Sequence, residues 1–195
     1  MYSKKSFVII CLVILSALLI TGCLPTTTVT TPEEYFTFDS TTRTITDYDI
    51  AGGLDVVIPS TIGGVAVYHI GIDAFLEKYL TSVIIPDSVV SIGACAFRNN
   101  LLTSVTIGNS VVSIGDWVFA NNLLTSVTIP NSVKSIGDWV FTNNQLTSVT
   151  IGAGVDIGSD STTMGTNPGF KTVYDGGGKL TGTYNYTGGG VWVKI

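Results

Sequence analysis

The sequence is poor in charged residues, which make up 12% of its 195 residues, about half the usual share. It has a formal net charge of −5 and no basic cluster apart from Lys4 and Lys5. It therefore lacks the electrostatic footprint of a nucleic-acid-binding protein. The few charges and the 22 glycines also disfavour long solvated helices. The length suits one folded domain preceded by a leader.

Histidine and cysteine are scarce as well. His69 is the only histidine, and the three cysteines stand at positions 11, 23 and 95. A zinc site needs three or four convergent ligands, and no pair of these residues has the spacing of such a site. A serine triad through His69 lacks a G-x-S-x-G motif. We therefore expect no metal, no other cofactor and no catalytic residues.

The first 22 residues have the pattern of a secretory signal peptide. Two lysines precede an almost wholly apolar run at residues 6–20, which is short for a membrane span. The run ends in the tetrapeptide ITGC at residues 20–23, which resembles the lipobox of bacterial lipoproteins. This resemblance implies cleavage before Cys23 and a lipid anchor on Cys23, whereas an ordinary signal peptide is the alternative. Residues 23–34 are rich in Thr and Pro, which predicts an extended tether.

One phrase recurs through the middle of the chain. It reads LTSVIIPDSVVSIGACAF at residues 80–97, LTSVTIGNSVVSIGDWVF at 102–119 and LTSVTIPNSVKSIGDWVF at 124–141, a period of 22. A degenerate earlier copy at residues 57–75 carries a five-residue insertion. A fixed period of this length predicts a solenoid, in which each coil is stable only when stacked on its neighbours.

The alternation within each repeat predicts which side chains face inward. The pattern L-x-x-V-x-I is that of a strand, and V-x-S-I-G is that of a second short extended piece. An Asn pair then marks a turn, since Asn tolerates left-handed backbone. One column never changes and is expected in the core: Phe75, Phe97, Phe119 and Phe141.

The repeat consensus L-T-S-V-T-I-P-x-S-V-x-S-I-G-x-x-A/V-F-x-x-N resembles the BspA-type leucine-rich repeat of bacterial surface proteins over residues 57–157. The resemblance implies a mainly β leucine-rich-repeat solenoid of 22-residue coils with short strands and helical turns. Residues 35–56 resemble its N-terminal cap. Residues 158–195 resemble its C-terminal segment, where the GGG at 188–190 predicts a hairpin. Family members are exposed at the cell surface and are associated with adhesion and protein binding.

Two surfaces are candidates for partner binding. The column Asp73, Cys95, Trp117, Trp139 accepts an Asp, so we expect Trp117 and Trp139 to be adjacent and partly exposed, as paired interface anchors or as edge packing. The outward face of the first strand of each coil forms an uncharged hydroxyl ladder that suits a partner strand or a glycan, or simply reflects strand propensity. Its candidate residues are Ser104, Thr106, Ser126 and Thr128, and the ladder continues at residues 82–84 and 148–150.

Together these features predict a non-catalytic lipoprotein of the bacterial envelope, lipid-anchored at the outer membrane or cell surface, that binds a protein or glycan. A structural envelope lipoprotein or scaffold is the alternative. A carbohydrate-active enzyme is more remote, and only Asp116 and Asp138, one period apart, favour it. The repeat itself produces this pair.

Overall fold

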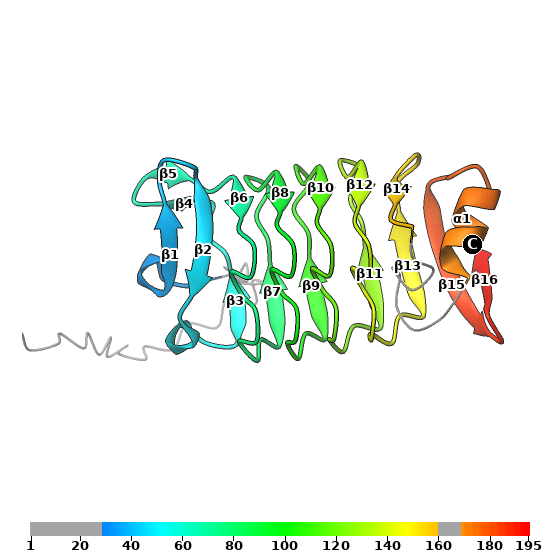
Figure 1. Ribbon diagram of the computed structural model, residues 1–195, viewed down its shortest axis with the longest axis horizontal. Helices are drawn as coiled ribbons and strands as arrows, with labels where there is room; N and C mark the ends of the chain where they lie inside the picture. Colours follow the sequence, from blue (N-terminus) through cyan, green and yellow to red (C-terminus); the bar gives the residue numbers. More distant parts are fainter. Residues whose placement is uncertain (1–28, 160–168) are drawn as a thin grey trace, which may run out of the picture.

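The computed structural model describes residues 29–159 and 169–195. Cys23, the expected leader and most of the expected tether therefore lie outside the described residues. The described chain is mainly β and forms a solenoid whose short strands succeed one another along a single axis (Figure 1). Within these ranges, no helix has the length and apolar character needed to cross a bilayer.

Two sides of the solenoid are built from strands. One side is a single sheet in the order β1 (Phe36–Asp39), β2 (Thr44–Tyr48), β6 (His69–Ile70), β8 (Ser91–Ile92), β10 (Ser113–Ile114), β12 (Ser135–Ile136) and β14 (Asp156–Ile157). The other side holds two sheets. The first contains β3 (Asp55–Val57), β7 (Ser82–Ile84) and β9 (Ser104–Thr106), and the second contains β11 (Ser126–Thr128), β13 (Ser148–Ile151), β15 (Gly182–Gly188) and β16 (Val191–Lys194).

Elements outside these sheets lie in the first coil or near the two ends of the described chain. They are the hairpin β4 (Thr61–Ile62) and β5 (Val65–Ala66), the 3-10 turns η1 (Glu33–Tyr35) and η2 (Ile50–Gly52), and the helix α1 (Phe170–Gly176). The hairpin β4–β5 accommodates the five-residue insertion of the degenerate first repeat. At one end β2 pairs with β6, and at the other β13 pairs antiparallel with β15. The predicted C-terminal hairpin is confirmed, because β15 and β16 pair antiparallel across the glycines at 188–190.

Adjacent coils are in register at the predicted period. Ser113 of β10 pairs in parallel with Ser91 on one side and Ser135 on the other. The coils approach closely where the second extended piece ends: a Cβ on Gly93 would lie 2.7 Å from the backbone nitrogen of Ile72 in the preceding coil. Glycine recurs at this position because no side chain fits between the backbones.

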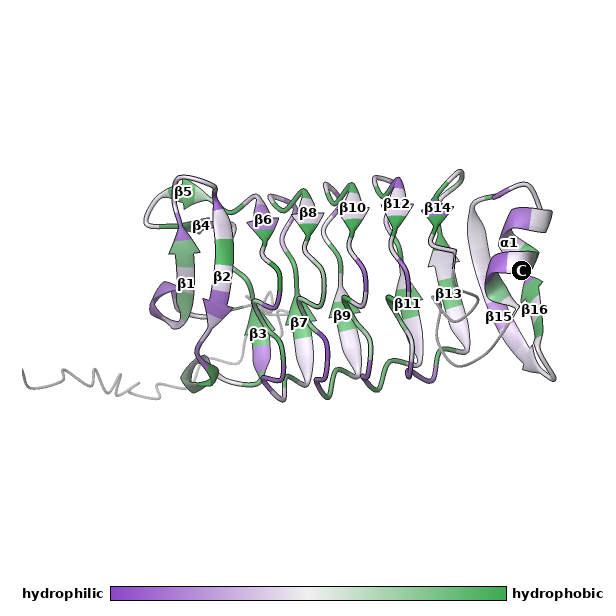
Figure 2. Ribbon diagram, in the orientation of Figure 1, coloured by the Kyte–Doolittle hydropathy of each residue, from purple (hydrophilic) through white to green (hydrophobic). Residues whose placement is uncertain are grey.

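The predicted core columns are confirmed. The four phenylalanines are fully buried, and neighbouring rings stack with centroids 4.7–5.5 Å apart: Phe75 on Phe97, Phe97 on Phe119 and Phe119 on Phe141. The Leu, Val and Ile columns of the strands lie around this stack. Figure 2 shows hydrophobic segments recurring at the same positions from coil to coil.

The turns of the coils are not helices, although helical turns were expected. Among the described residues, helical structure is limited to η1, η2 and α1, and none of these lies in a repeated turn. Arg98 N donates to Cys95 O at 3.0 Å, and Cys95 itself has a φ of 58°. Trp117 and Trp139 have the same left-handed conformation, which stops a right-handed helix from propagating through the turn.

The second Asn of each pair closes the coil from within. Asn122 is buried, its Oδ1 accepts from Leu102 N at 3.0 Å, and its Nδ2 donates to the carbonyls of Phe97 and Phe119 at 3.0 Å each. Asn100 and Asn144 make the corresponding contacts in their coils. The first Asn of each pair takes the left-handed conformation, as predicted: Asn99, Asn121 and Asn143.

We expect Asn122→Ala to lower the free energy of unfolding by about 2 kcal/mol or more, since it leaves the buried N–H of Leu102 without its acceptor and removes the amide's bonds to the carbonyls of Phe97 and Phe119. The adjacent Asn121 is the control. Glycine accepts its φ of 58°, so Asn121→Gly should cost less than about 1 kcal/mol. Urea unfolding of both variants measures the difference, and equal losses would mean that the buried amide does not hold the coils together.

Candidate functional site

The outward face of the strands β7, β9, β11 and β13 carries the hydroxyl ladder. Successive side chains of a strand point to opposite sides, so Val127 of β11 is buried while Ser126 and Thr128 are exposed. Ser104 and Thr106 of β9 are likewise exposed. The structure therefore brings the four candidate hydroxyl residues together on two neighbouring coils at the centre of this face.

The hydroxyls on either side of this centre are already bonded within the protein. At one end Asp55 accepts from Thr81 Oγ1 at 2.6 Å and from Ser82 Oγ at 2.7 Å, and these hydroxyls lower the pKa of the Asp55 carboxyl. At the other end Ser148 Oγ donates to Asn185 Oδ1 at 2.9 Å, and the hydroxyls of Thr150 and Thr183 lie 2.9 Å apart.

The four central hydroxyls differ from these. Within residues 29–159 and 169–195, no hydrogen bond ties the side-chain hydroxyl of Ser104, Thr106, Ser126 or Thr128 to another protein group. They remain available to a ligand.

The two strands that carry these hydroxyls are not paired with each other. Ile85 N donates to Thr106 O at 2.9 Å, which closes β7 onto β9, and Ile129 N donates to Thr150 O at 2.8 Å, which closes β11 onto β13. In the described chain, the equivalent bond from Ile107 N to Thr128 O is missing, and the sheet is divided between β9 and β11. We call this division the seam. Figure 1 shows β9 and β11 as neighbours on this side of the solenoid.

A cleft follows the seam. It has a volume of about 350 Å³ and is lined by Val105, Thr106, Ile107, Asn109, Thr128 and Pro130. Val105 is half-buried there, whereas the equivalent Val83, Val127 and Val149 are buried. A second cleft of about 330 Å³ adjoins it, shares Asn109, Thr128 and Pro130, and reaches Thr150, Thr181 and Thr183. Neither cleft is lined by a charged side chain.

Trp117 and Trp139 lie side by side in a different place, on the turns that follow β10 and β12. Both are half-buried, and their rings stack with centroids 4.8 Å apart and planes 22° from parallel. The guanidinium of Arg98, a residue that the sequence analysis missed, lies 5.1 Å from the centroid of the Trp117 ring. Trp117 thus has Arg98 and Trp139 as ring neighbours, so less of its ring surface is open to a partner than the sequence suggested.

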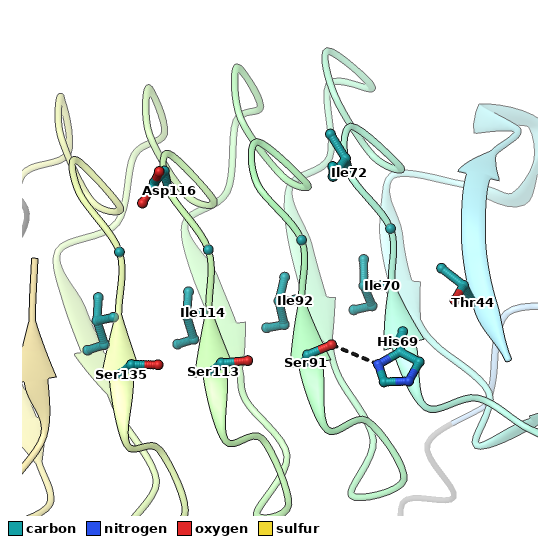
Figure 3. A pocket seen from close by; sticks show the side chains of 15 residues that line it. Thr44, His69, Ile70, Ile72, Ser91, Ile92, Ser113, Ile114, Asp116 and Ser135 are labelled. Atoms are coloured by element: carbon teal, nitrogen blue, oxygen red, sulfur yellow. Dashed lines mark hydrogen bonds between the residues drawn. The ribbon is translucent and has the colours of Figure 1, made fainter. Parts of the chain in front are cut away.

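A shallow groove runs along the opposite, longer sheet. It has a volume of about 520 Å³, and Figure 3 shows Ser91, Ser113 and Ser135 aligned along it with Asp116 on the other rim. His69 heads this row, and its Nδ1 lies 2.7 Å from Ser91 Oγ. The histidine therefore sits at the edge of the first coil, as expected.

The described residues do not gather a set of metal ligands. No group of three or more His, Cys, Asp or Glu side chains that could hold a metal occurs among them. Asp116 is exposed, and its Oδ1 accepts from Asp138 N at 2.9 Å, so the carboxylate bonds to the backbone of the next coil.

Comparisons with known proteins agree with this architecture. Residues 66–167 match the family described as BspA type leucine rich repeat region, in six copies. Among curated proteins, no sequence matches the chain.

Three solved structures are similar to parts of the chain. A leucine-rich repeat protein from Eubacterium ventriosum is 27% identical, with a TM-score of 0.52, over 60% of this chain and 33% of that one. A leucine-rich repeat protein from Bacteroides capillosus is 36% identical, with a TM-score of 0.45, over 48% of this chain and 74% of that one. A leucine rich cell surface protein from Faecalibacterium prausnitzii is 25% identical, with a TM-score of 0.38, over 82% of this chain and 58% of that one. Of the three, the first supports the solenoid fold, and this chain spans about a third of its length.

The stacked tryptophans yield a prediction about stability. Trp117 and Trp139 have positive φ, which lowers the stability of the fold by about 1–2 kcal/mol for a bulky residue. Asparagine largely avoids this cost, and the gain offsets the ring stacking and partial burial that the two tryptophans lose. We expect Trp117→Asn with Trp139→Asn to change the free energy of unfolding by less than about 1.5 kcal/mol. Phe119→Ala, which leaves a cavity in the phenylalanine stack, should cost about 3–5 kcal/mol. Urea unfolding compares them, and an equal loss would make the tryptophans core residues.

Proposed function

The chain belongs to the BspA-type leucine-rich repeat family, and from this premise we propose that it is a lipid-anchored surface protein of the bacterial envelope that binds a macromolecular partner without catalysis. Repetition supplies an extended, rigid surface, which is what a binding protein needs and a small catalytic site does not.

One observation carries the binding function. At the centre of the strand face, the hydroxyls of Ser104, Thr106, Ser126 and Thr128 are exposed, while those on both sides are bonded within the protein. Inward contacts hold the strands that carry them, so the hydroxyls are fixed in position before a partner arrives. A preorganised surface of this kind loses little conformational entropy on binding.

The absence of catalysis in this proposal rests on the family, which is a repeat family rather than an enzyme family, and on the exposure of Asp116.

The stacked pair Trp117 and Trp139 is a second candidate contact, since tryptophan is favoured at interfaces and both rings are partly exposed. A structural lipoprotein or scaffold is the alternative, in which the same face would have no ligand.

The anchor is inferred from the sequence alone. The tetrapeptide at residues 20–23 follows a charged start and an apolar run, and Thr- and Pro-rich residues separate Cys23 from the solenoid. An extended tether of this length would hold the repeats about 30 Å from the membrane surface. The strand face would then be presented outside the bilayer.

Metabolic labelling with a fatty-acid analogue tests the anchor. We expect the wild-type chain to be labelled and Cys23→Ser to be unlabelled, because the thiol is the acceptor of the lipid. Equal labelling of the two chains would remove the anchor from the proposal and leave the solenoid unaffected.

A pair of charged substitutions tests the binding face. The full chain, held in a zwitterionic detergent, is used to capture partners from envelope and host extracts. Ser104→Glu with Ser126→Glu should weaken retention of the captured partner by about 2 kcal/mol or more, roughly thirtyfold, because two carboxylates would have to be desolvated at the interface. The matched control is Ser113→Glu with Ser135→Glu, which places two glutamates in the same two coils but on the opposite sheet.

The outcomes separate the alternatives. Loss of binding in the first pair and retention in the control support the strand face. Unchanged binding in both, with loss in Trp117→Asn and Trp139→Asn, would transfer the site to the tryptophan pair. A chain that retains no partner at all would favour the scaffold.

A further inference from the structure

We propose that the seam between β9 and β11 is a subsite for a neutral saccharide. This inference rests on the proposed binding function and specifies the chemistry of its ligand. It draws on the lining of the cleft, on the unpaired backbone groups along its edges and on the contacts that keep the two coils together.

The side chains along the seam match the two kinds of surface that a sugar ring offers. The hydroxyls of Thr106 and Thr128 and the amide of Asn109 both donate and accept hydrogen bonds, as sugar hydroxyls do. Val105, which is half-buried, supplies apolar surface beside them against which the C–H face of a ring can pack, whereas Ile107 and Pro130 line the cleft but are themselves buried. A few convergent polar groups around an apolar floor are typical of a small-molecule site, and the volume of about 350 Å³ is within the usual range.

The backbone adds fixed polar groups to this set. Within the described ranges, Ile107 N has no hydrogen-bond partner and Thr128 O receives no bond from it, although both positions are bonded in the neighbouring coils. Backbone groups that the fold leaves unpaired must be satisfied by solvent or by a ligand. A hydroxylated ligand can satisfy both, since each sugar hydroxyl is at once a donor and an acceptor.

The charge of the site favours a neutral ligand. No Lys, Arg, Asp or Glu side chain lines the seam cleft, so an acidic sugar or a phosphate would find no counter-ion among its lining side chains. Lys134 comes near the adjoining cleft, with its Nζ 3.5 Å from the carbonyl of Asn131, but its side chain does not line that cleft. Burying an uncompensated charge is expensive, whereas a neutral hydroxyl loses little when its bonds to water are replaced.

An inserted peptide strand fits the seam less well. Pairing with both edges would require β9 and β11 to separate by about 4.8 Å more, the spacing of one strand. Leu123 N donates to Leu102 O at 3.0 Å beside the seam, and β10 pairs with β12 on the opposite side of the same coils. These bonds hold the coils together, so the seam admits a ligand from outside and not a strand between them.

The adjoining cleft indicates that the ligand is an oligosaccharide. It shares Asn109, Thr128 and Pro130 with the seam and extends toward Thr150, Thr181 and Thr183. A linear saccharide could therefore continue from the seam along a path lined by hydroxyls.

Calorimetric titration with defined oligosaccharides tests the proposal. The full chain is held in a zwitterionic detergent that contains no sugar, and the probes are cellohexaose, maltohexaose, mannohexaose and, as the charged comparison, a hexamer of galacturonic acid. We expect at least one neutral hexaose to bind and the acidic hexamer to bind at least tenfold more weakly.

Thr106→Val with Thr128→Val removes two hydroxyls and keeps the β-branched shape that suits a strand. This pair should weaken the neutral hexaose at least tenfold. Thr37→Val with Thr46→Val, two exposed threonines on β1 and β2, is the matched control and should stay within twofold. Circular dichroism establishes that both pairs remain folded.

Two results would overturn the assignment. The first is that none of the neutral hexaoses binds while the chain still captures a protein through the strand face, in which case the proposed function stands and the saccharide subsite fails. The second is that a hexaose binds equally to the wild type and to the Thr106→Val, Thr128→Val pair, which would place the sugar elsewhere.

Discussion

The side-chain amides of Asn100, Asn122 and Asn144 set the constraint on which the rest of the solenoid depends. Each amide bonds to the backbone at the start of its own coil and to a carbonyl of the coil before it. A coil can therefore stack in one register only, with equivalent residues in contact. The phenylalanine stack, the glycines without room for a Cβ and the paired strands all follow from that register. An unpaired buried amide would be costly, which disfavours slippage of one repeated coil against the next.

This rigidity explains how a chain with so few charges can present a specific surface. Inward side chains fix the strands, and the outward hydroxyls lie in rows whose spacing is that of the coils. Near the two ends of the face, these hydroxyls are bonded within the protein. The central four stay open beside a seam that supplies backbone donors and acceptors. The repeated residues of this face are thus alike in sequence but differ in their hydrogen bonding, and the unbonded central hydroxyls are where we propose that a partner binds.

Much of the fold was predictable because it follows from periodicity. The period of 22, the buried Phe column, the left-handed Asn turn and the C-terminal hairpin each have a local signal in the residues. The turns around Cys95 were expected to be helical, but the left-handed residue in each coil prevents it. The helix α1 was not predicted; its Phe170 and Tyr174, four residues apart, were its one signal.

The candidate site was less predictable. The four hydroxyls follow from strand alternation, but the seam has no sequence signal, since β9 and β11 have the same residues, S-V-T. The ring contact between Arg98 and Trp117 needs three-dimensional proximity, because the two residues lie on different coils. Whether neighbouring strands of a solenoid form backbone hydrogen bonds depends on how the coils pack against one another, and the sequence of a single repeat does not determine this packing.

Backbone hydrogen exchange of the native chain tests the central claim most directly. If backbone hydrogen bonds join neighbouring coils along the strand face everywhere except at the seam, the amides of Ile85 and Ile129, which are bonded across coils, should be protected. The amide of Ile107, at the equivalent position in the coil between them, should exchange about a hundredfold faster or more. Equal protection at Ile85, Ile107 and Ile129 would show a continuous sheet and contradict the account.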